Sequence, residues 1–161
     1  MVEGKSVSAS KVTMTELVLP THTNALGNIF GGVVMSWIDI ASAICAQRHS
    51  QSPVVTASVD DLHFINPIKL GWVVNLNASI NFVGRTSMEC GVRVDAENPT
   101  TGEHFHAVSA YTTFVSLDSM GKPRAVPPLI LETDLEKERH ERAKFRRKQR
   151  LERKRLTAKK S

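Results

Sequence analysis

Cysteine is scarce in this sequence. The chain has 161 residues and two cysteines, Cys45 and Cys90, which lie in apolar surroundings and match no metal or redox spacing. A chain without a disulfide framework is typical of a reducing compartment, so we expect a cytoplasmic protein. Residues 1–11 (MVEGKSVSASK) are polar throughout and lack the charged and then apolar pattern of a secretory signal peptide.

Uncharged apolar runs long enough to cross a membrane are also scarce. The one long apolar segment lies between Asn24 and Gln47, and Asp39 interrupts it. A transmembrane helix needs about 18 or more residues with few charges, a length that this segment approaches only when Asp39 is counted within it. Because its apolar residues recur with helical spacing, we interpret it as the central helix of a soluble domain. Burying a carboxylate without partners is costly, so Asp39 is expected to have a function.

Excess positive charge is absent from most of the chain. From residue 132 to the end there are 13 Lys and Arg against 6 Asp and Glu, which gives a net charge of +7. Residues 1–131 hold the other 8 basic and 10 acidic residues, a net charge of −2. The length fits one domain with a substantial core. The basic character therefore belongs to a tail, residues 132–161, and not to the domain.

Patterns typical of strands flank the apolar helix. They cover residues 11–19, 54–64, 72–82, 86–96 and 104–117, separated by turn signals rich in Gly, Pro and Asn. Short connections favour antiparallel neighbours. The sequence therefore predicts an α+β domain over residues 11–131, with one antiparallel sheet of about five strands wrapped around one long helix. Residues 1–10 are expected to be a disordered lead, and the tail to be helical or disordered.

Several motifs of this domain resemble those of one known family. They are TN at residues 23–24, GNIFGG at 27–32, MSWID at 35–39, VTASV at 55–59, FINPI at 64–68, VGRTS at 83–87, FVSLD at 114–118 and GKPRAVP at 121–127. Together they resemble the signature of the hotdog-fold acyl-CoA thioesterases, in the branch that contains small bacterial enzymes and the mammalian cytosolic brain acyl-CoA hydrolase. The resemblance covers roughly residues 11–131 and implies a hotdog domain, in agreement with the predicted order of helix and strands.

The resemblance implies an acyl-CoA hydrolase that releases free fatty acid and CoA. It makes Asp39 the catalytic carboxylate, acting either as general base or as nucleophile. Asn28 stands where the family carries a second polar catalytic residue, which would orient water or hydrogen-bond the thioester. Both residues have structural alternatives. Asp39 could be satisfied by Ser36 or Ser42 one turn away, and Asn28 could be a turn residue with left-handed backbone.

A glycine pair, Gly31 and Gly32, leads into the N-terminus of the apolar helix. Unpaired N–H groups and the helix dipole at such an end can polarise a thioester carbonyl, and glycine allows close approach of the substrate. Asn28 and Asp39 are eleven residues apart, too far to meet within one chain at about 1.5 Å per helical residue. In the family they meet across a dimer interface. The resemblance therefore implies a homodimer, and hexamers built as trimers of dimers are common in the family.

The CoA moiety is expected to contact polar and basic groups. Arg85, Thr86 and Ser87 match the family's CoA-contacting stretch, and an arginine suits a nucleotide diphosphate. Alternatively, Arg85 is an exposed turn cation. Ser58 and Val59 are expected to line the acyl and pantetheine tunnel through backbone contacts. CoA is part of the substrate, so no cofactor is expected. No metal is expected either, because two strand histidines (residues 104 and 106) have no evident third ligand.

The tail has sparse leucines in a background of Lys, Arg and Glu, with acidic residues early and basic residues late, as suits a helix dipole. It is interpreted either as a solvated helix or as a weak contact for an anionic surface. Nucleic acid is less favoured, because few aromatic side chains are available to stack on bases. A rival function is a non-catalytic acyl-CoA-binding sensor whose tail contacts nucleic acid. The presence of both Asn28 and Asp39 favours the enzyme.

Overall fold

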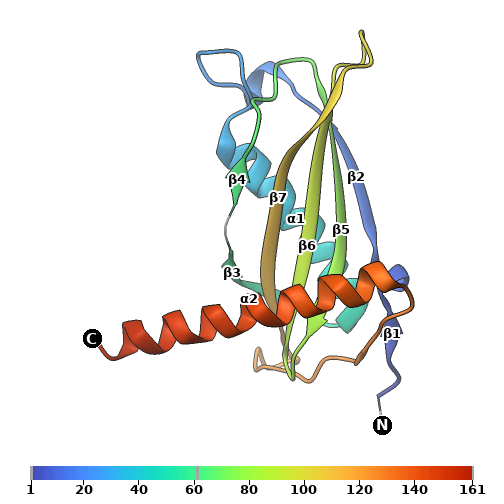
Figure 1. Ribbon diagram of the computed structural model, residues 1–161, viewed down its shortest axis with the longest axis vertical. Helices are drawn as coiled ribbons and strands as arrows, with labels where there is room; N and C mark the ends of the chain where they lie inside the picture. The colour runs from blue at the N-terminus through green and yellow to red at the C-terminus, as the bar shows by residue number, and fades with distance from the viewer. Residues whose placement is uncertain (1, 61, 161) are drawn as a thin grey trace.

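An antiparallel sheet curls around a long helix in the computed structural model, which describes residues 2–60 and 62–160 (Figure 1). The helix is α1 (Gly31–Ser50). The strands follow the order β2 (Val12–Leu17), β5 (Val73–Val83), β6 (Ser87–Glu97), β7 (His104–Ser116) and β3 (Val54–Val59), and β4 (His63–Phe64) also pairs with β7. Neighbouring strands of this sheet are antiparallel. The predicted α+β fold, a sheet of about five strands around one central helix, is confirmed.

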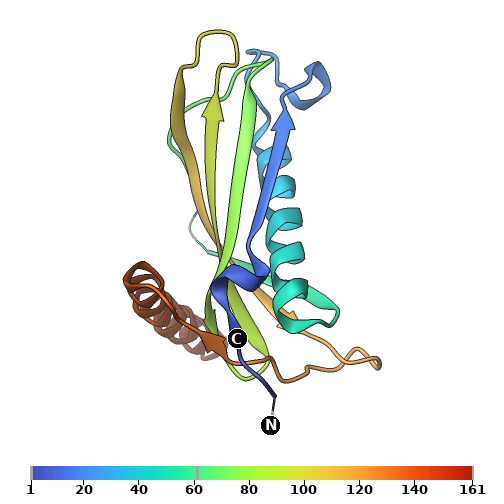
Figure 2. The ribbon, with the colours of Figure 1, turned by 90° about the vertical axis from the view of Figure 1, so that its right-hand side faces the viewer.

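The two faces of the sheet differ because its strands alternate in polarity. In β5, Val74, Leu76 and Ile80 are buried in the core with α1, whereas Asn75 and Asn77 occupy the alternate positions. Figure 2 shows α1 on one face of the sheet and a second helix, α2 (Asp134–Ala158), on the other. We refer to the face toward α1 as the inner face and the face toward α2 as the outer face.

Helix α1 has apolar side chains on its exposed side as well as on the side that packs into the core. One side packs into the core, but Met35, Ile40 and Ile44 are 46%, 48% and 37% exposed. On β3, the edge strand that contacts α1, Val55 and Val59 are 47% and 43% exposed. Exposed apolar side chains gathered on adjacent elements are typical of a surface that binds another protein.

Residues 5–10, part of the predicted disordered lead, are instead ordered. Strand β1 (Lys5–Ser6) pairs in parallel with β8 (Leu129–Ile130), and a 3₁₀ turn, Val7–Ser10, follows it. Val7 is 2% exposed and Ser10 is fully buried. The partner of this segment lies more than a hundred residues later in the chain, so its polar local composition did not reveal the pairing.

The predicted strand over residues 54–64 is interrupted. It forms β3 and β4, and β3 has a β-bulge between Thr56 and Ser58. The bulge changes which side chains share a face, because an extra residue shifts the alternation by one position. The single uninterrupted strand expected over residues 54–64 is therefore wrong.

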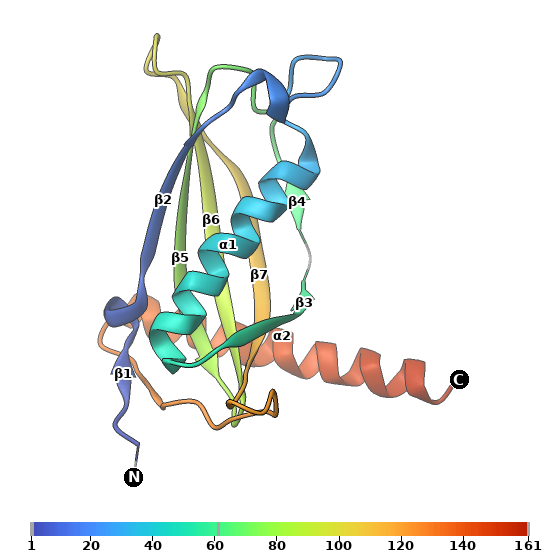
Figure 3. The same ribbon diagram turned by 180° about the vertical axis from the view of Figure 1, so that it is seen from behind.

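The basic tail forms helix α2, which starts with a capping box. The Thr133 hydroxyl accepts a bond from the Glu136 N–H at 3.1 Å, and the Glu136 carboxylate accepts one from the Thr133 N–H at 3.2 Å. α2 crosses the sheet and continues past the β3 and β4 edge (Figures 1 and 3). Its last part, residues 151–158, is exposed at every position. In the described residues no helix has the length and apolar character to cross a membrane.

Candidate active site

Asp39 lies on α1 and is held by a neighbouring strand. The Thr56 hydroxyl of β3 donates a hydrogen bond to Asp39 Oδ1 at 2.7 Å. The partners considered from the sequence are engaged otherwise or unpaired: Ser36 donates to the Val33 carbonyl at 2.7 Å, and the buried Ser42 hydroxyl has no hydrogen-bond partner among the described residues. Sequence reasoning missed Thr56, although it stands in one of the family motifs, because nothing local joins two residues 17 positions apart.

Asp39 borders the exposed apolar surface of α1. Ile40 follows it directly, Met35 and Ile44 lie about one turn away, and Thr56 on β3 is itself exposed. The carboxylate is half-buried, and Met35, four residues before it on the helix, is uncovered on nearly the same side. A ligand or a second chain on this surface would contact Asp39.

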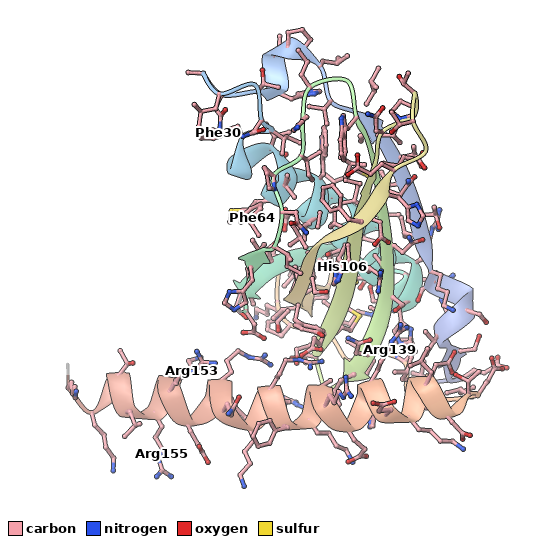
Figure 4. The ribbon with its side chains drawn as sticks, turned by 45° about the horizontal axis from the view of Figure 1, so that its top comes forward. Phe30, Phe64, His106, Arg139, Arg153 and Arg155 are labelled. Atoms are coloured by element: carbon pink, nitrogen blue, oxygen red, sulfur yellow. The ribbon has the colours of Figure 1, made fainter. Side chains whose placement is uncertain are left out.

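The N-terminus of α1 is open and lined by aromatic rings. Its N-cap residue, Phe30, has no side-chain capping bond, so the first N–H groups of the helix have no cap from that side chain. A Cβ added at Gly32 would lie 2.8 Å from Phe30 Cε1, and one at Gly31 would lie 3.4 Å from Phe64 Cζ. Phe30 and Phe64 lie at the same margin of the molecule (Figure 4). Glycine is therefore needed at Gly32 for the ring to lie against the backbone.

The loop before α1 is organised by Asn24. Its Oδ1 accepts hydrogen bonds from the N–H groups of Leu26 at 3.0 Å and Asn28 at 3.3 Å, and its own N–H donates to the Asn28 carbonyl at 2.8 Å. Gly27 supplies the left-handed backbone conformation, with φ of 75°. Asn24 is thus the residue whose side chain closes this turn.

Asn28 does not have the left-handed backbone that the turn alternative requires. Gln51 is the only non-glycine residue with positive φ in the described chain. Asn28 is half-buried and forms an isolated bridge with Lys69. No hydrogen bond joins Asn24 or Asn28 to Asp39 within residues 2–60 and 62–160.

The helix N-terminus and the Asp39–Thr56 pair lie at different levels of the sheet. Phe64, beside Gly31, pairs with Val108 of β7, whereas Thr56 pairs with Phe114. Six residues along a strand correspond to about 20 Å. Gly31 and Asp39 are themselves eight residues apart on α1, about 12 Å along its axis. A single chain therefore does not bring the predicted oxyanion-binding glycines and the carboxylate to one carbonyl group.

The segment predicted to contact CoA forms the tight turn between β5 and β6, at the end of the sheet away from the α1 N-terminus (Figure 3). Arg85 is exposed, and its carbonyl accepts from the Val126 N–H at 3.0 Å. The Thr86 carbonyl accepts from the Ser116 N–H at 2.9 Å. Ser87 pairs with Val115, the neighbour of the residue opposite Thr56. The turn therefore lies at the same end of the sheet as the Asp39–Thr56 pair.

Ser58 and Val59 lie past the bulge of β3. Ser58 pairs with Thr113, which in turn pairs with Glu89 on β6, so these three side chains share the outer face. The hydroxyls of Ser58 and Thr113 are buried without a hydrogen-bond partner among the described residues. The side chain of Ser58 thus faces away from α1, and its backbone is what remains to contact a substrate there.

No group of three or more His, Cys, Asp and Glu side chains in the described chain could hold a metal ion. The Nε2 of His106, one of the two strand histidines, lies 2.8 Å from the Ser109 hydroxyl and 3.1 Å from the Val108 carbonyl, within hydrogen-bond distance of both.

Comparison with known proteins gives consistent matches. A family model described as the thioesterase superfamily matches residues 26–103. The acyl-CoA thioester hydrolase YkhA of Bacillus subtilis strain 168, described as uncharacterized, is 41% identical over 153 residues, 95% of this chain and 89% of that protein. The cytosolic acyl coenzyme A thioester hydrolase of Mus musculus is 38% identical over 146 residues, 89% of this chain and 38% of the mouse protein.

Solved structures agree over nearly the whole chain, α2 included. An acyl-CoA hydrolase from Staphylococcus aureus, in complex with butyryl coenzyme A, coenzyme A and coenzyme A disulfide, has a TM-score of 0.90 and 37% identity, covering 96% of this chain and 94% of that one. An apo-hexameric acyl-CoA thioesterase has a TM-score of 0.91 and 39% identity, covering 94% and 97%. The S. aureus protein also has structures with alanine in place of an aspartate at its position 43, an asparagine at 28 and a threonine at 60.

Proposed function

The chain belongs to the thioesterase superfamily, among its acyl-CoA thioester hydrolases, and we propose that it hydrolyses fatty acyl-CoA to free fatty acid and CoA. The observation that carries this proposal is the Asp39–Thr56 hydrogen bond, which fixes a catalytic carboxylate beside an uncovered apolar surface. Such a surface suits an acyl chain and a second subunit, and the carboxylate suits the activation of water.

Hydrolysis requires water to add to the thioester carbonyl, a base to take its proton and a stabilised oxyanion. Thr56 engages Oδ1 of Asp39, so Oδ2 is proposed to act, either by accepting the proton of water or by attacking the carbonyl itself. The N–H groups of Gly31 and Gly32 at the α1 N-terminus are proposed to bind the oxyanion. In the first case the C–S bond then breaks, and the CoA sulfur takes up the proton that Asp39 accepted. In the second, the C–S bond breaks as an acyl anhydride forms on Asp39, and water then cleaves this anhydride, releasing the fatty acid and supplying the proton that the CoA sulfur takes up. One water is consumed, and one carboxylic acid and one thiol are formed.

Two chains are proposed to build each site. The roughly 12 Å between Gly31 and Asp39 along α1 is too long for both to reach one carbonyl, so the helix N-terminus of one subunit would serve the Asp39 of its partner. The free edge of β3 and the exposed side chains of Met35, Ile40 and Ile44 support pairing of two copies through this surface. The hexamer predicted from the resemblance stays a prediction for this chain, supported by the hexameric relative.

The amide of the site is proposed to be Asn24, with Asn28 as the second candidate. In the S. aureus protein, the substituted asparagine, aspartate and threonine stand at positions 28, 43 and 60, so they are separated by 15 and 17 residues. Asn24, Asp39 and Thr56 have these same separations in this chain. The backbone bonds of the Asn24 side chain use Oδ1, which leaves Nδ2 to donate to water or to the thioester.

Substrate contacts and location complete the proposal. The turn of Arg85, Thr86 and Ser87 is proposed to bind CoA phosphates, and the backbone of Ser58 and Val59 to line the tunnel. Only water and acyl-CoA are required as reactants, so no cofactor is proposed. The cytoplasmic location predicted from the cysteines stays a prediction.

A thiol-release assay with acyl-CoAs from acetyl to palmitoyl tests the activity. We expect turnover by the native protein, and loss of about 10²–10⁴-fold in the Asp39→Asn variant with acyl-CoA binding retained. Glu103→Gln, in the exposed turn between β6 and β7, is the matched control. Binding of acyl-CoA without any thiol release by the native protein would instead favour the sensor.

Subunit mixing tests the shared site. Asn24→Ala and Asp39→Ala homodimers would each lack half of both sites, whereas a mixed dimer has one intact site. Random exchange makes about half of the dimers mixed, so roughly a quarter of native activity should return on mixing. The same experiment with Asn28→Ala decides between the asparagines. No recovery with either variant, when mass spectrometry shows exchange, would place the whole site in one chain.

A further inference from the structure

Helix α2 is joined to the outer face of the sheet by two partly buried ion pairs. In the first, Arg146 binds Glu89 of β6 through both ends of its guanidinium, Nε to Oε2 at 3.1 Å and Nη2 to Oε1 at 2.7 Å. The Glu89 side chain is 2% exposed. The guanidinium also lies 3.6 Å from the ring centroid of Tyr111 on β7. This pair fixes the position of α2 across β6 and β7.

The second ion pair reaches the end of β3. Arg150 Nη1 lies 3.0 Å from Asp60 Oδ2, and the two side chains are 22% and 12% exposed. Asp60 is the residue directly after β3, and its N–H still donates to the Tyr111 carbonyl at 2.8 Å. Arg150 thus links α2 to the end of the strand that carries Thr56.

The two faces of this short strand have different partners. Before the bulge, Thr56 is opposite the buried Phe114 and bonds Asp39 on α1. After it, Ser58 is opposite Thr113 on the outer face. The bulge therefore lets six residues direct Thr56 toward Asp39 on one face of the sheet and Ser58 toward the other face, on which α2 lies.

β3 is weakly held apart from these contacts. It is an edge strand that pairs with β7 on one side, and its ladder is irregular at the bulge. Such strands open more readily than central strands, because fewer hydrogen bonds and packed side chains must be broken. A shift of about 1 Å in a group that orients a catalytic residue can lower a rate about a hundredfold.

We propose that Arg150 is a positioning residue: through Asp60 it holds the end of β3 that follows the bulge, so that the Thr56 hydroxyl keeps the Asp39 carboxylate oriented for hydrolysis. This inference rests on the proposed function of Asp39. Positioning by Arg150 requires α2 only as far as Arg150. The exposed residues beyond Arg150 are dispensable for the rate of hydrolysis. In Figure 4, Arg153 of this last part lies on the side of α2 toward the sheet and Arg155 on the side away from it, both beyond the Arg150 contact.

The test compares Arg150→Met, which keeps the aliphatic stem, with Arg142→Met. Arg142 is a matched control on the same helix, since its ion pair with Glu138 is 69% and 54% exposed. With the full chain and acyl-CoA as substrate, we expect kcat of Arg150→Met to fall about tenfold with KM within about twofold. Arg142→Met should match the native enzyme. Arg150→Lys, which can still reach Asp60, should recover part of the loss.

A double-mutant cycle separates positioning from a general loss of stability. Thr56→Ala removes the link by which Arg150 is proposed to act, so adding Arg150→Met to it should lower kcat by less than about twofold further. Assays are run well below the melting temperature of each variant. Unchanged kcat in Arg150→Met, or a full additive loss in the double variant, would overturn the proposal. A native protein without hydrolysis would instead overturn the proposed function, so the two failures are distinguishable.

Discussion

The inner and outer faces of the sheet are each closed by a helix, but by different interactions. Against α1, the inner face buries side chains such as Leu76, Ile80 and Phe114, each at most 1% exposed. Against α2, the outer face buries Glu89, which pairs with Arg146 and accepts a bond from Asn81 Nδ2 at 3.2 Å. One interface is made of apolar area and the other of a specific set of polar partners.

This difference separates stability from specificity. Apolar burial contributes about 25 cal/mol per Å² with little directional preference. A buried ion pair gains little net free energy over well-packed apolar residues, but any arrangement that leaves one charge unpaired is penalised. The inner face therefore supplies most of the folding free energy, and the outer face sets where α2 lies along the strands.

The largest expected effect on stability follows from breaking the Arg146–Glu89 ion pair of the outer face. Glu89→Ala leaves the Arg146 guanidinium, whose side chain is 20% exposed, without its counter-ion, so the free energy of unfolding should fall by up to about 3–5 kcal/mol, measured by urea denaturation. Glu141→Ala, which removes an exposed pair with Lys144, is the control and should change it by about 0.5 kcal/mol or less. Equal losses in the two variants would mean that burial of the pair is not what matters.

Replacing both partners sharpens the same comparison. In the double variant Glu89→Met and Arg146→Met no charge remains unpaired, so the unfolding free energy should return to within about 1–2 kcal/mol of the native value. The contact between α2 and the outer face would then be apolar at this point, like the contact between α1 and the inner face. A double variant as unstable as Glu89→Ala would contradict the view that specificity, and not net stability, is what the pair supplies.

Behind the inner face, a buried titratable group, His49, has no charged hydrogen-bond partner among the described residues and is stabilised in its neutral form. His49, at the end of α1, is fully buried, and its Nε2 lies 2.9 Å from the Pro127 carbonyl. Burial lowers the pKa of His49 below its usual 6.5. Between that lowered pKa and about 6.5 the unfolded chain binds a proton that the folded chain does not.

Stability should therefore be full above about pH 6.5 and decline as the pH falls below it, by at most about 1.4 kcal/mol per pH unit for this one proton. Urea midpoints measured from pH 7.5 to 5 check this. His49→Gln should flatten the slope, while His104→Gln, at an exposed position, should keep it. An unchanged slope in His49→Gln would assign the pH dependence to other groups.

The smallest effect is expected at the free end of α2. Removing residues 151–161 leaves both outer ion pairs intact, so unfolding free energy should change by about 0.5 kcal/mol or less, and activity should be native. The truncation should lose a weak, salt-sensitive binding to anionic lipid vesicles, because the exposed cations of this segment are removed. Vesicle cosedimentation at low and high salt measures it. Loss of activity would show that the catalytic fold needs the whole helix.

The predictability of the fold and of the site differ for a physical reason. Helix α1 and the long strands follow from local periodicity and turn residues, so their order and the fold class could be read directly. Asp39 was visible as a charge in an apolar run. Thr56 was not identified as its partner, because the two residues are 17 positions apart and no local pattern joins them. The ordering of residues 5–10 was missed because it depends on β8.

The sequence by itself determined the fold class and the central helix and singled out the carboxylate of Asp39, because each is encoded by residues that are neighbours along the chain. Only the tertiary structure decided what holds that carboxylate and where the basic tail lies. The bonds involved join residues 17, 57 and 90 positions apart, from Thr56 to Asp39, from Arg146 to Glu89 and from Arg150 to Asp60. Contacts of such separation form only when the sheet has folded, and no periodicity in the sequence records them.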